Sequence, residues 1–165
     1  LVYNILIPNY QPSMWSKNED GPGYNLVMFF ALRPSARKIL ESNGDASAKL
    51  YKQWLNMVKA NSNEETTARH KAIVKIDNED ELDLGAMKKL VTAYNGKPFM
   101  TGPTCNFFDF GEKNQYLEVG INVHKFNYIC RRSASGLMPV VPTLIVEIGM
   151  VIQGEEDSEL PERLL

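Results

Sequence analysis

The sequence predicts an α+β fold in which a mostly antiparallel, curved sheet packs on two to four helices. Apolar and polar residues alternate over residues 116–123 and again over residues 143–153, a period of two that is typical of strands. The other strand-like segments come mostly as neighbours along the chain, and the helical segments are grouped between pairs of them. This order differs from the regular strand–helix alternation of parallel α/β folds.

Length and composition are those of one globular domain. The chain has 165 residues, of which 44% are hydrophobic and 23% charged, and its net charge is -2. This charge argues against a dedicated nucleic-acid surface. No apolar run approaches the roughly 20 residues of a membrane span, and the N-terminus lacks the basic region and cleavage site of a signal peptide. We therefore expect a cytoplasmic protein that does not bind nucleic acid.

The N-terminal third is predicted to form a hairpin. Residues 1–8 and 24–32 are rich in β-branched and aromatic side chains, as strands are. The residues between them, 9–23, are dense in Pro, Gly, Asn and Asp, which predicts a loop. Met14 and Trp15 lie in this loop, where they could insert into an interface or pack back on the sheet, and packing is the favoured interpretation.

Two helices and a strand are predicted next. Ser35 is a plausible N-cap for the first helix, which is expected to end at Gly44, and Asp45 is a plausible N-cap for the second. The polar residues 61–67 predict a surface loop. A short strand over residues 70–77 follows.

The C-terminal half is predicted to alternate between helices and strands. Acidic residues open a third helix, as the helix dipole favours, and the alternation over 143–153, apolar on one face and mixed on the other, predicts a central strand covered by helices. The predicted elements are a helix from 78–81 to Asn95-Gly96, a β section over 99–110, a turn at 111–114, the strand 116–123, a helix within 126–141 stopped by Pro139 or Pro142, the strand 143–153, and a further turn or helix at 160–165.

No enzyme signature, cofactor or metal site emerges from the sequence. The glycines match neither nucleotide-binding pattern, no Ser lies in a Gly-x-Ser-x-Gly elbow, and the His and Cys residues lack metal-ligand spacing. Cys105 and Cys130 are interpreted as free thiols in a reducing compartment. A hydrolase that pairs His124 with Cys130 is a minor alternative. The acidic residues 155–159 lack the alternating ligands of a Ca²⁺ loop and predict a solvated turn.

A cluster of cations beside aromatic and apolar groups suggests a binding surface. Lys125, Arg131 and Arg132 flank Tyr128 in the apolar segment 126–141. This combination suits an anionic lipid headgroup or a membrane surface. The alternative is that the two arginines cap and solvate a helix end. The core could also enclose a hydrophobic ligand, although such residues more often only fill a core.

Four segments resemble the C-terminal domain of the plant Enhanced Disease Resistance 2 protein family, in the form found in protists. The end of the chain, PTLIVEIGMVIQGEEDSELPERLL, is similar to the family's strand, acidic turn and closing motif, and YLEV at 116–119 is similar to its Y-L-E-[IV] strand. GKP at 96–98 and GYNLV at 23–27 also stand in the expected order. The resemblance runs from about Ile5 onward and is weak over 35–67. Since family domains usually begin further upstream, we expect a segment of a larger protein that lacks its first strands.

The resemblance implies a membrane context but no catalytic residues. In plants the domain follows a pleckstrin-homology domain and a START lipid-transfer domain, in proteins that act at membranes and restrain defence and cell death. A START-like (helix-grip) sheet is compatible with the predicted elements, and the sequence leaves that choice open. We expect a non-enzymatic lipid- or membrane-associated module, peripheral on membranes, with anionic lipid and neighbouring lipid-binding domains as partners. The alternative is a protein-interaction or structural domain.

Overall fold

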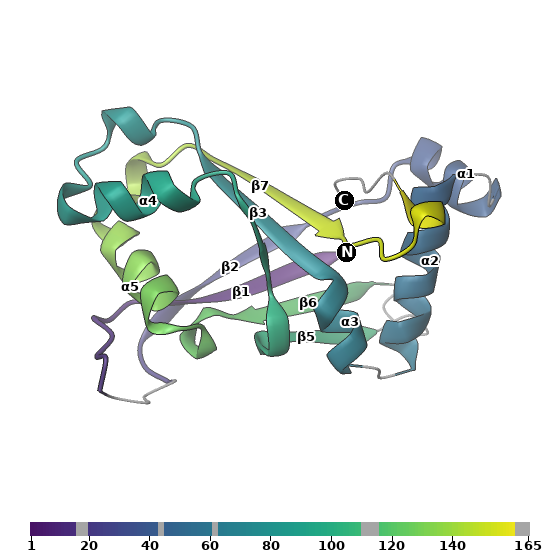
Figure 1. Ribbon diagram of the computed structural model, residues 1–165, viewed down its shortest axis with the longest axis horizontal. Coiled ribbons are helices and arrows are strands. Elements are labelled where there is room, and N and C mark those ends of the chain that lie inside the picture. Colours follow the sequence, from purple (N-terminus) through teal and green to yellow (C-terminus); the bar gives the residue numbers. More distant parts are fainter. Residues whose placement is uncertain (16–19, 43–44, 61–62, 110–115, 161–165) are drawn as a thin grey trace.

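The computed structural model describes residues 1–15, 20–42, 45–60, 63–109 and 116–160, and over these the predicted α+β class is confirmed (Figure 1). The strands are β1 (Val2–Pro8), β2 (Gly23–Phe29), β3 (His70–Ile76), β4 (Pro98–Met100), β5 (Cys105–Asp109), β6 (Leu117–Asn122) and β7 (Val146–Ile152). The α-helices are α1 (Pro34–Ser42), α2 (Ala46–Lys59), α3 (Asn63–Arg69), α4 (Lys88–Tyr94) and α5 (Tyr128–Leu137).

The strands form two open sheets rather than one curved sheet. One sheet has the order β2-β1-β6-β5 and the other the order β4-β3-β7. All pairs are antiparallel except β1 with β6, which run parallel. The two long strands of the sequence, β6 and β7, therefore belong to different sheets. The neighbours of a strand are decided by contacts between distant segments, which the alternation of residues within the strand does not encode.

β7 is an edge strand, so the prediction of a central strand is wrong. Among the strands that the structure describes it pairs with β3 alone. Its last three residues are buried, and two of them, Met150 and Ile152, pack in the cluster that includes α2. The sequence predicted that helices cover this strand, and α2 does so at its C-terminal end, but the central position in a sheet is not found among the described strands.

The predicted hairpin of β1 and β2 is present in the four-stranded sheet, and the predicted β section 99–110 contributes β5, which pairs with β6. β1 and β2 pair antiparallel from Val2↔Phe29 to Pro8↔Gly23, and β5 pairs antiparallel with β6. The predicted turn at 111–114 lies outside the described residues. The alternation in β6 is confirmed, since Leu117, Val119 and Ile121 are buried and the residues between them are partly exposed.

The helix caps are partly confirmed. Asp45 is the N-cap of α2, and its carboxylate accepts a hydrogen bond from the Ser47 N–H at 2.9 Å. Ser35 is not the cap of α1, because that helix already begins at Pro34, and proline suits the first helical position. The predicted end at Gly44 and the segment at 161–165 lie outside the described residues.

Helix α3 contradicts the loop predicted for residues 61–67. Its sequence is polar and gives little helical signal. The Trp54 Nε1 of α2 donates a hydrogen bond to the Thr66 carbonyl oxygen at 3.3 Å, and Thr66 is buried. Packing against α2 therefore stabilises a helix whose own sequence predicts none, as is common for short helices.

The third predicted helix is broken. Residues 79–81 and 85–87 form short 3₁₀ turns, named η1 (Glu79–Glu81) and η2 (Gly85–Met87), before α4 begins. Gly85 has φ of +47°, a left-handed conformation that interrupts an α-helix. The helix predicted within 126–141 is confirmed as α5, and it gives way at Met138 to the 3₁₀ segment η5 (Met138–Thr143), which contains both prolines.

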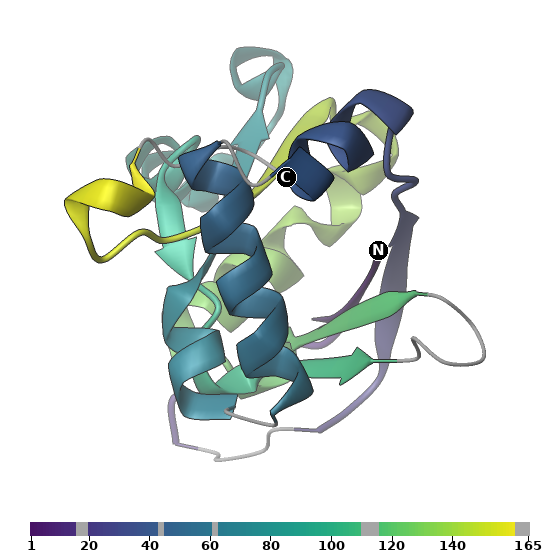
Figure 2. The same cartoon turned by 90° about the vertical axis from the view of Figure 1, so that its right-hand side faces the viewer.

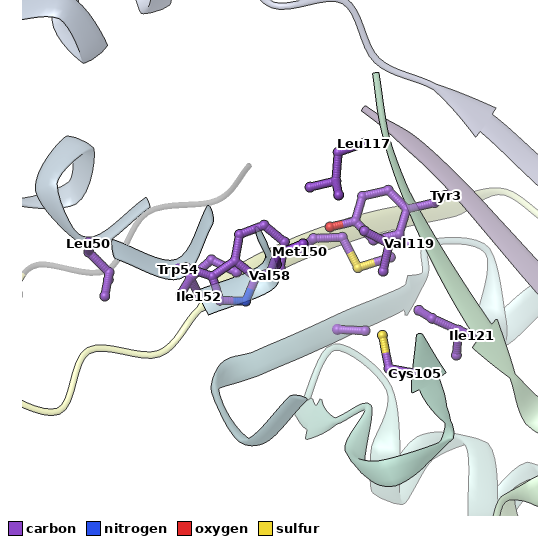
Figure 3. Packing of buried hydrophobic residues seen from close by; sticks show 11 residues of the cluster. Tyr3, Leu50, Trp54, Val58, Cys105, Leu117, Val119, Ile121, Met150 and Ile152 are labelled. Carbon is purple, nitrogen blue, oxygen red and sulfur yellow. The ribbon is translucent and has the colours of Figure 1, made fainter. Parts of the chain in front are cut away.

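One buried cluster joins both sheets to α2. Figure 2 shows α2 in the foreground, with α3 on one side and β5 and β6 on the other. The cluster draws side chains from six elements (Figure 3): Tyr3, Leu50, Trp54, Val58, Ala72, Cys105, Leu117, Val119, Ile121, Met150 and Ile152. A smaller cluster of Ile76, Leu84 and Val91 packs α4 on the far end of β3.

Candidate membrane-contact surface and apolar cleft

The loop after β1 lies on the segment that carries the predicted cations. The Tyr10 hydroxyl is 3.3 Å from Nδ1 of His124, and the Gln11 side-chain oxygen accepts a hydrogen bond from Arg132 at 2.5 Å. Figure 1 shows this loop leaving β1 at the lower left, beside α5. The loop that carries Met14 and Trp15 is therefore hydrogen-bonded to the segment that carries the predicted cations. We call Met14, Trp15, Lys125 and Arg132 together the loop–α5 surface.

The side chains at the tip of the described part of the loop point into solvent. Trp15 is 94% exposed and Met14 is 71% exposed. The favoured prediction that these residues pack back on the sheet is therefore wrong. The Trp15 N–H donates to the Ser13 hydroxyl at 3.1 Å, a local bond that shapes the turn without burying the indole.

The predicted cations do not all reach this surface. Lys125 is exposed, and Arg132 is partly exposed and held by Gln11. Arg131 is only 8% exposed. Consecutive residues of an α-helix point about 100° apart, so Arg131 faces the interior while Arg132 faces the loop. Neither arginine caps α5: Asn127 does so, accepting the Cys130 N–H at 2.9 Å. The prediction that Arg131 belongs to the binding surface is therefore wrong, because its side chain is buried. Tyr128 is half-buried.

His124 and Cys130 have surroundings that suit structural roles. His124 is buried, and its ring packs on Tyr10 with centroids 5.6 Å apart. Burial raises the pKa of the Cys130 thiol, which disfavours the thiolate that a nucleophile requires. Cys105 is buried more deeply, and its pKa is raised to about 12 by burial. Both cysteines are free thiols, as predicted.

A buried polar network, which the sequence did not reveal, surrounds His70. The Thr101 hydroxyl donates to the His70 carbonyl oxygen at 3.2 Å and accepts from His70 Nδ1 at 2.9 Å. This leaves Nε2 as the acceptor for the Tyr3 hydroxyl at 3.0 Å. Burial lowers the pKa of His70 to about 4, so the ring is neutral near pH 7. The network satisfies buried polar groups and rigidifies the core.

The acidic turn near the C-terminus is a tethered structure. Arg69 contacts Glu155 at 2.8 Å and Glu159 at 3.3 Å, and Glu159 is buried. The Glu159 carboxylate also accepts the Glu155 N–H at 2.7 Å, which lowers its pKa. The prediction of a solvated turn is wrong for Glu159, because its partner Arg69 is 90 residues away in sequence. In the part of the chain that the structure describes, no three His, Cys, Asp or Glu side chains are grouped to hold a metal ion.

An open apolar cleft lies between α1, α2 and the edge of the four-stranded sheet. Its volume is about 1630 Å³, larger than a typical ligand pocket of roughly 300–1,000 Å³. Its lining comes from five separate stretches of the chain, and the apolar side chains include Val2 of β1, Val27, Phe29, Phe30, Leu32, Ile39 and Leu40 from β2 to α1, Leu50, Tyr51 and Leu55 of α2, Leu117 of β6 and Ile152 of β7. Arg33, Arg37 and Lys59 add positive charge. No single stretch of sequence signals this cleft.

Among the described helices none combines the length and the apolar character required to cross a membrane. Comparison with known proteins adds one finding. The family model described as "Protein ENHANCED DISEASE RESISTANCE 2, C-terminal" matches residues 1–165, the whole chain. Searches of curated proteins and of solved structures found no match. The chain therefore belongs to the family of C-terminal domains of Enhanced Disease Resistance 2 proteins.

Proposed function

We propose that this domain is a non-enzymatic module that binds cytoplasmic membrane faces peripherally through the loop–α5 surface. The observation that carries the proposal is the full exposure of Trp15 beside Met14, on a loop that is hydrogen-bonded to the helix bearing Arg132. A tryptophan suits the membrane interface because its ring is apolar and its N–H is polar. Lys125 and Arg132 supply positive charge for anionic headgroups.

The apolar cleft supports a second contact with lipid. Its walls are aliphatic and aromatic, and Arg33, Arg37 and Lys59 stand among them. In this contact the acyl chain of a lipid lies on the apolar walls, and Arg33, Arg37 or Lys59 binds the anionic headgroup of the same lipid. Lipid extraction from the purified domain, followed by mass spectrometry, tests this part. A domain that carries no lipid and does not bind anionic vesicles would contradict the proposal as a whole.

Replacing Trp15 with alanine is expected to weaken binding to phosphatidylserine-containing vesicles by about tenfold. The estimate takes about 1.5 kcal/mol for burying a large apolar side chain. Vesicle co-sedimentation measures the change. Tyr94→Ala is the matched control, because it removes an exposed aromatic ring from α4, away from the surface. Equal binding by the parent and the Trp15→Ala variant would remove Trp15 from the contact.

Reversing the charge of Lys125 tests the headgroup contact. Lys125→Glu is expected to weaken binding to anionic vesicles by roughly tenfold, since each cation near a charged membrane contributes about 1 kcal/mol and the reversal replaces it with repulsion. Lys49→Glu on α2 makes the same change in net charge at another exposed position. The difference between the two variants should shrink at high salt. An identical loss in both would indicate a general charge effect.

A protein-interaction domain is the second candidate function. The observation that favours it is a run of apolar side chains that the fold leaves in solvent: Phe29, Phe30, Leu32 and Ile39. Contiguous exposed apolar groups of this kind are typical of surfaces that other polypeptides cover. These four side chains also line the apolar cleft, and they differ from those of the loop–α5 surface.

A further inference from the structure

The loop after β1 is anchored at its base and along its first arm. The Asn9 N–H donates a hydrogen bond to the Pro22 carbonyl oxygen at 2.9 Å, which brings the two arms of the loop together. Tyr10 is half-buried and Pro12 is buried, whereas the Trp15 side chain further along the same arm is almost fully exposed. A fixed segment therefore holds Trp15 out from the domain, because the chain is attached shortly before it.

Tyr10 is the central attachment, and a glycine on the returning arm makes room for its ring. The Tyr10 ring packs on His124 with centroids 5.6 Å apart, and its hydroxyl is 3.3 Å from His124 Nδ1. A Cβ atom at Gly21 would lie 2.7 Å from Cε1 of the same ring, closer than Cβ contacts allow. Gly23 is under the same constraint, since its Cβ would lie 2.6 Å from the Ile7 carbonyl oxygen and 2.9 Å from His124 Nε2. Neither glycine has a positive φ, so the close approach of other atoms, and not the backbone conformation, requires them.

These attachments decide where Trp15 can lie relative to the cations of the surface. Tyr10 rests on the residue before Lys125. Gln11 is bonded to Arg132 of α5. The chain from Tyr10 to Trp15 reaches at most about 18 Å, so a loop free of both attachments can carry the indole far from the cations. Ordering such a loop at a membrane costs conformational entropy, which an anchored loop loses already on folding.

We propose that Tyr10 is a positioning residue for the loop–α5 surface. Its ring packs on His124 and against Gly21, and so joins both arms of the loop to the segment that bears the cations. Trp15 and the two cations then reach a membrane together. The proposal rests on the proposed membrane function, and it assigns a role to a side chain that is half-buried and need not touch lipid.

Two substitutions disturb this position without changing a charge. Tyr10→Ala is expected to weaken binding to phosphatidylserine-containing vesicles by about tenfold, the loss expected when Trp15 no longer contributes. Gly21→Ala adds a methyl group that displaces the ring, and it should weaken binding by about threefold or more. Tyr10→Phe keeps the ring against Gly21 and should restore most of the binding that Tyr10→Ala loses. Gly120→Ala on β6 is the matched control, because its Cβ would meet no atom closer than 3.6 Å.

A double-mutant cycle measured by vesicle co-sedimentation separates positioning from direct contact with lipid. In the Trp15→Ala background, Tyr10→Ala should weaken binding by less than about threefold, because only Met14 remains to be positioned. An equal loss in both backgrounds would overturn the positioning role, since Tyr10 would then act on lipid or on folding by itself. Urea unfolding reports whether each variant is folded, and if Tyr10→Ala is unfolded, Gly21→Ala takes its place in the cycle.

The same series separates this proposal from the membrane proposal. A parent that does not bind the vesicles contradicts the membrane function, and the positioning role with it. A parent that binds, with Trp15→Ala weaker and both Tyr10→Ala and Gly21→Ala unchanged, overturns the positioning role alone. NMR of the protein without vesicles should show nuclear Overhauser contacts between the Tyr10 ring and Gly21, and their absence would also overturn it.

Discussion

Replacing Trp54 with alanine is expected to lower the free energy of unfolding by about 3–5 kcal/mol, the range for truncating a buried tryptophan. Trp54 is fully buried in α2 and touches both sheets. Its ring lies edge-on to Phe107 of β5 with centroids 5.1 Å apart, and it stacks on His70 of β3 at 6.1 Å. Since domains of this size are stable by only about 5–15 kcal/mol, the variant should lose much of its stability.

Urea unfolding at neutral pH measures this effect, and the chain supplies its own control. Trp15 is the only other tryptophan, and because it is exposed, Trp15→Ala should change stability by no more than about 0.5 kcal/mol. Trp54→Phe should fall between the two, since it keeps most of the ring contacts and loses the hydrogen bond to Thr66. Equal stabilities for the Trp54→Ala and Trp15→Ala variants would show that α2 does not join the sheets as described.

The domain is expected to lose about 2 kcal/mol of stability between pH 7 and pH 5 through His70 alone. Burial lowers the pKa of this histidine to about 4 in the folded state, whereas its unfolded pKa is about 6.5. Below pH 6.5 the unfolded chain binds a proton that the folded chain excludes, so acid favours unfolding. The loss begins near pH 6.5 and should approach about 3 kcal/mol near pH 4.

Two measurements check this pH dependence. Urea unfolding at a series of pH values gives the loss of stability, and NMR titration of the histidine ring protons gives the folded pKa. The chain has two histidines, so a His124→Gln variant assigns the remaining signal to His70. A His70 signal that titrates near pH 6.5 would show that the ring is not held neutral by the Tyr3–His70–Thr101 network.

The sequence predicted well the features that depend on neighbouring residues. The alternation in β6 identified a strand and its buried face, and the Asp45 cap identified the start of α2. The β1–β2 hairpin was predicted because its two strands are close in sequence and a loop of turn-forming residues separates them. These features follow from backbone preferences and side-chain periodicity, which act over a few residues.

The candidate surfaces were predicted less well, because they depend on distant contacts. Met14 and Trp15 were noticed in the sequence, but their exposure follows from how the loop is held, through Tyr10 on His124 and through Gln11 on Arg132 of α5. In the sequence Arg131 and Arg132 are indistinguishable as a basic pair. In the structure Arg131 is buried, whereas Arg132 binds Gln11 of the loop. The lining of the apolar cleft comes from five stretches of the chain, and none of them is distinctive by itself.

By itself the sequence determined the α+β class, the strands and most helices of this domain, and its family, because local periodicity and the closing motif are properties of the chain. The tertiary structure decided that β6 and β7 lie in separate sheets, that the polar segment 63–69 forms a helix, and that β2 remains an open edge. The physical reason is that strand pairing and burial are set by contacts between residues far apart in sequence. The parallel pair of β1 and β6 joins residues more than a hundred positions apart, which no local pattern can specify.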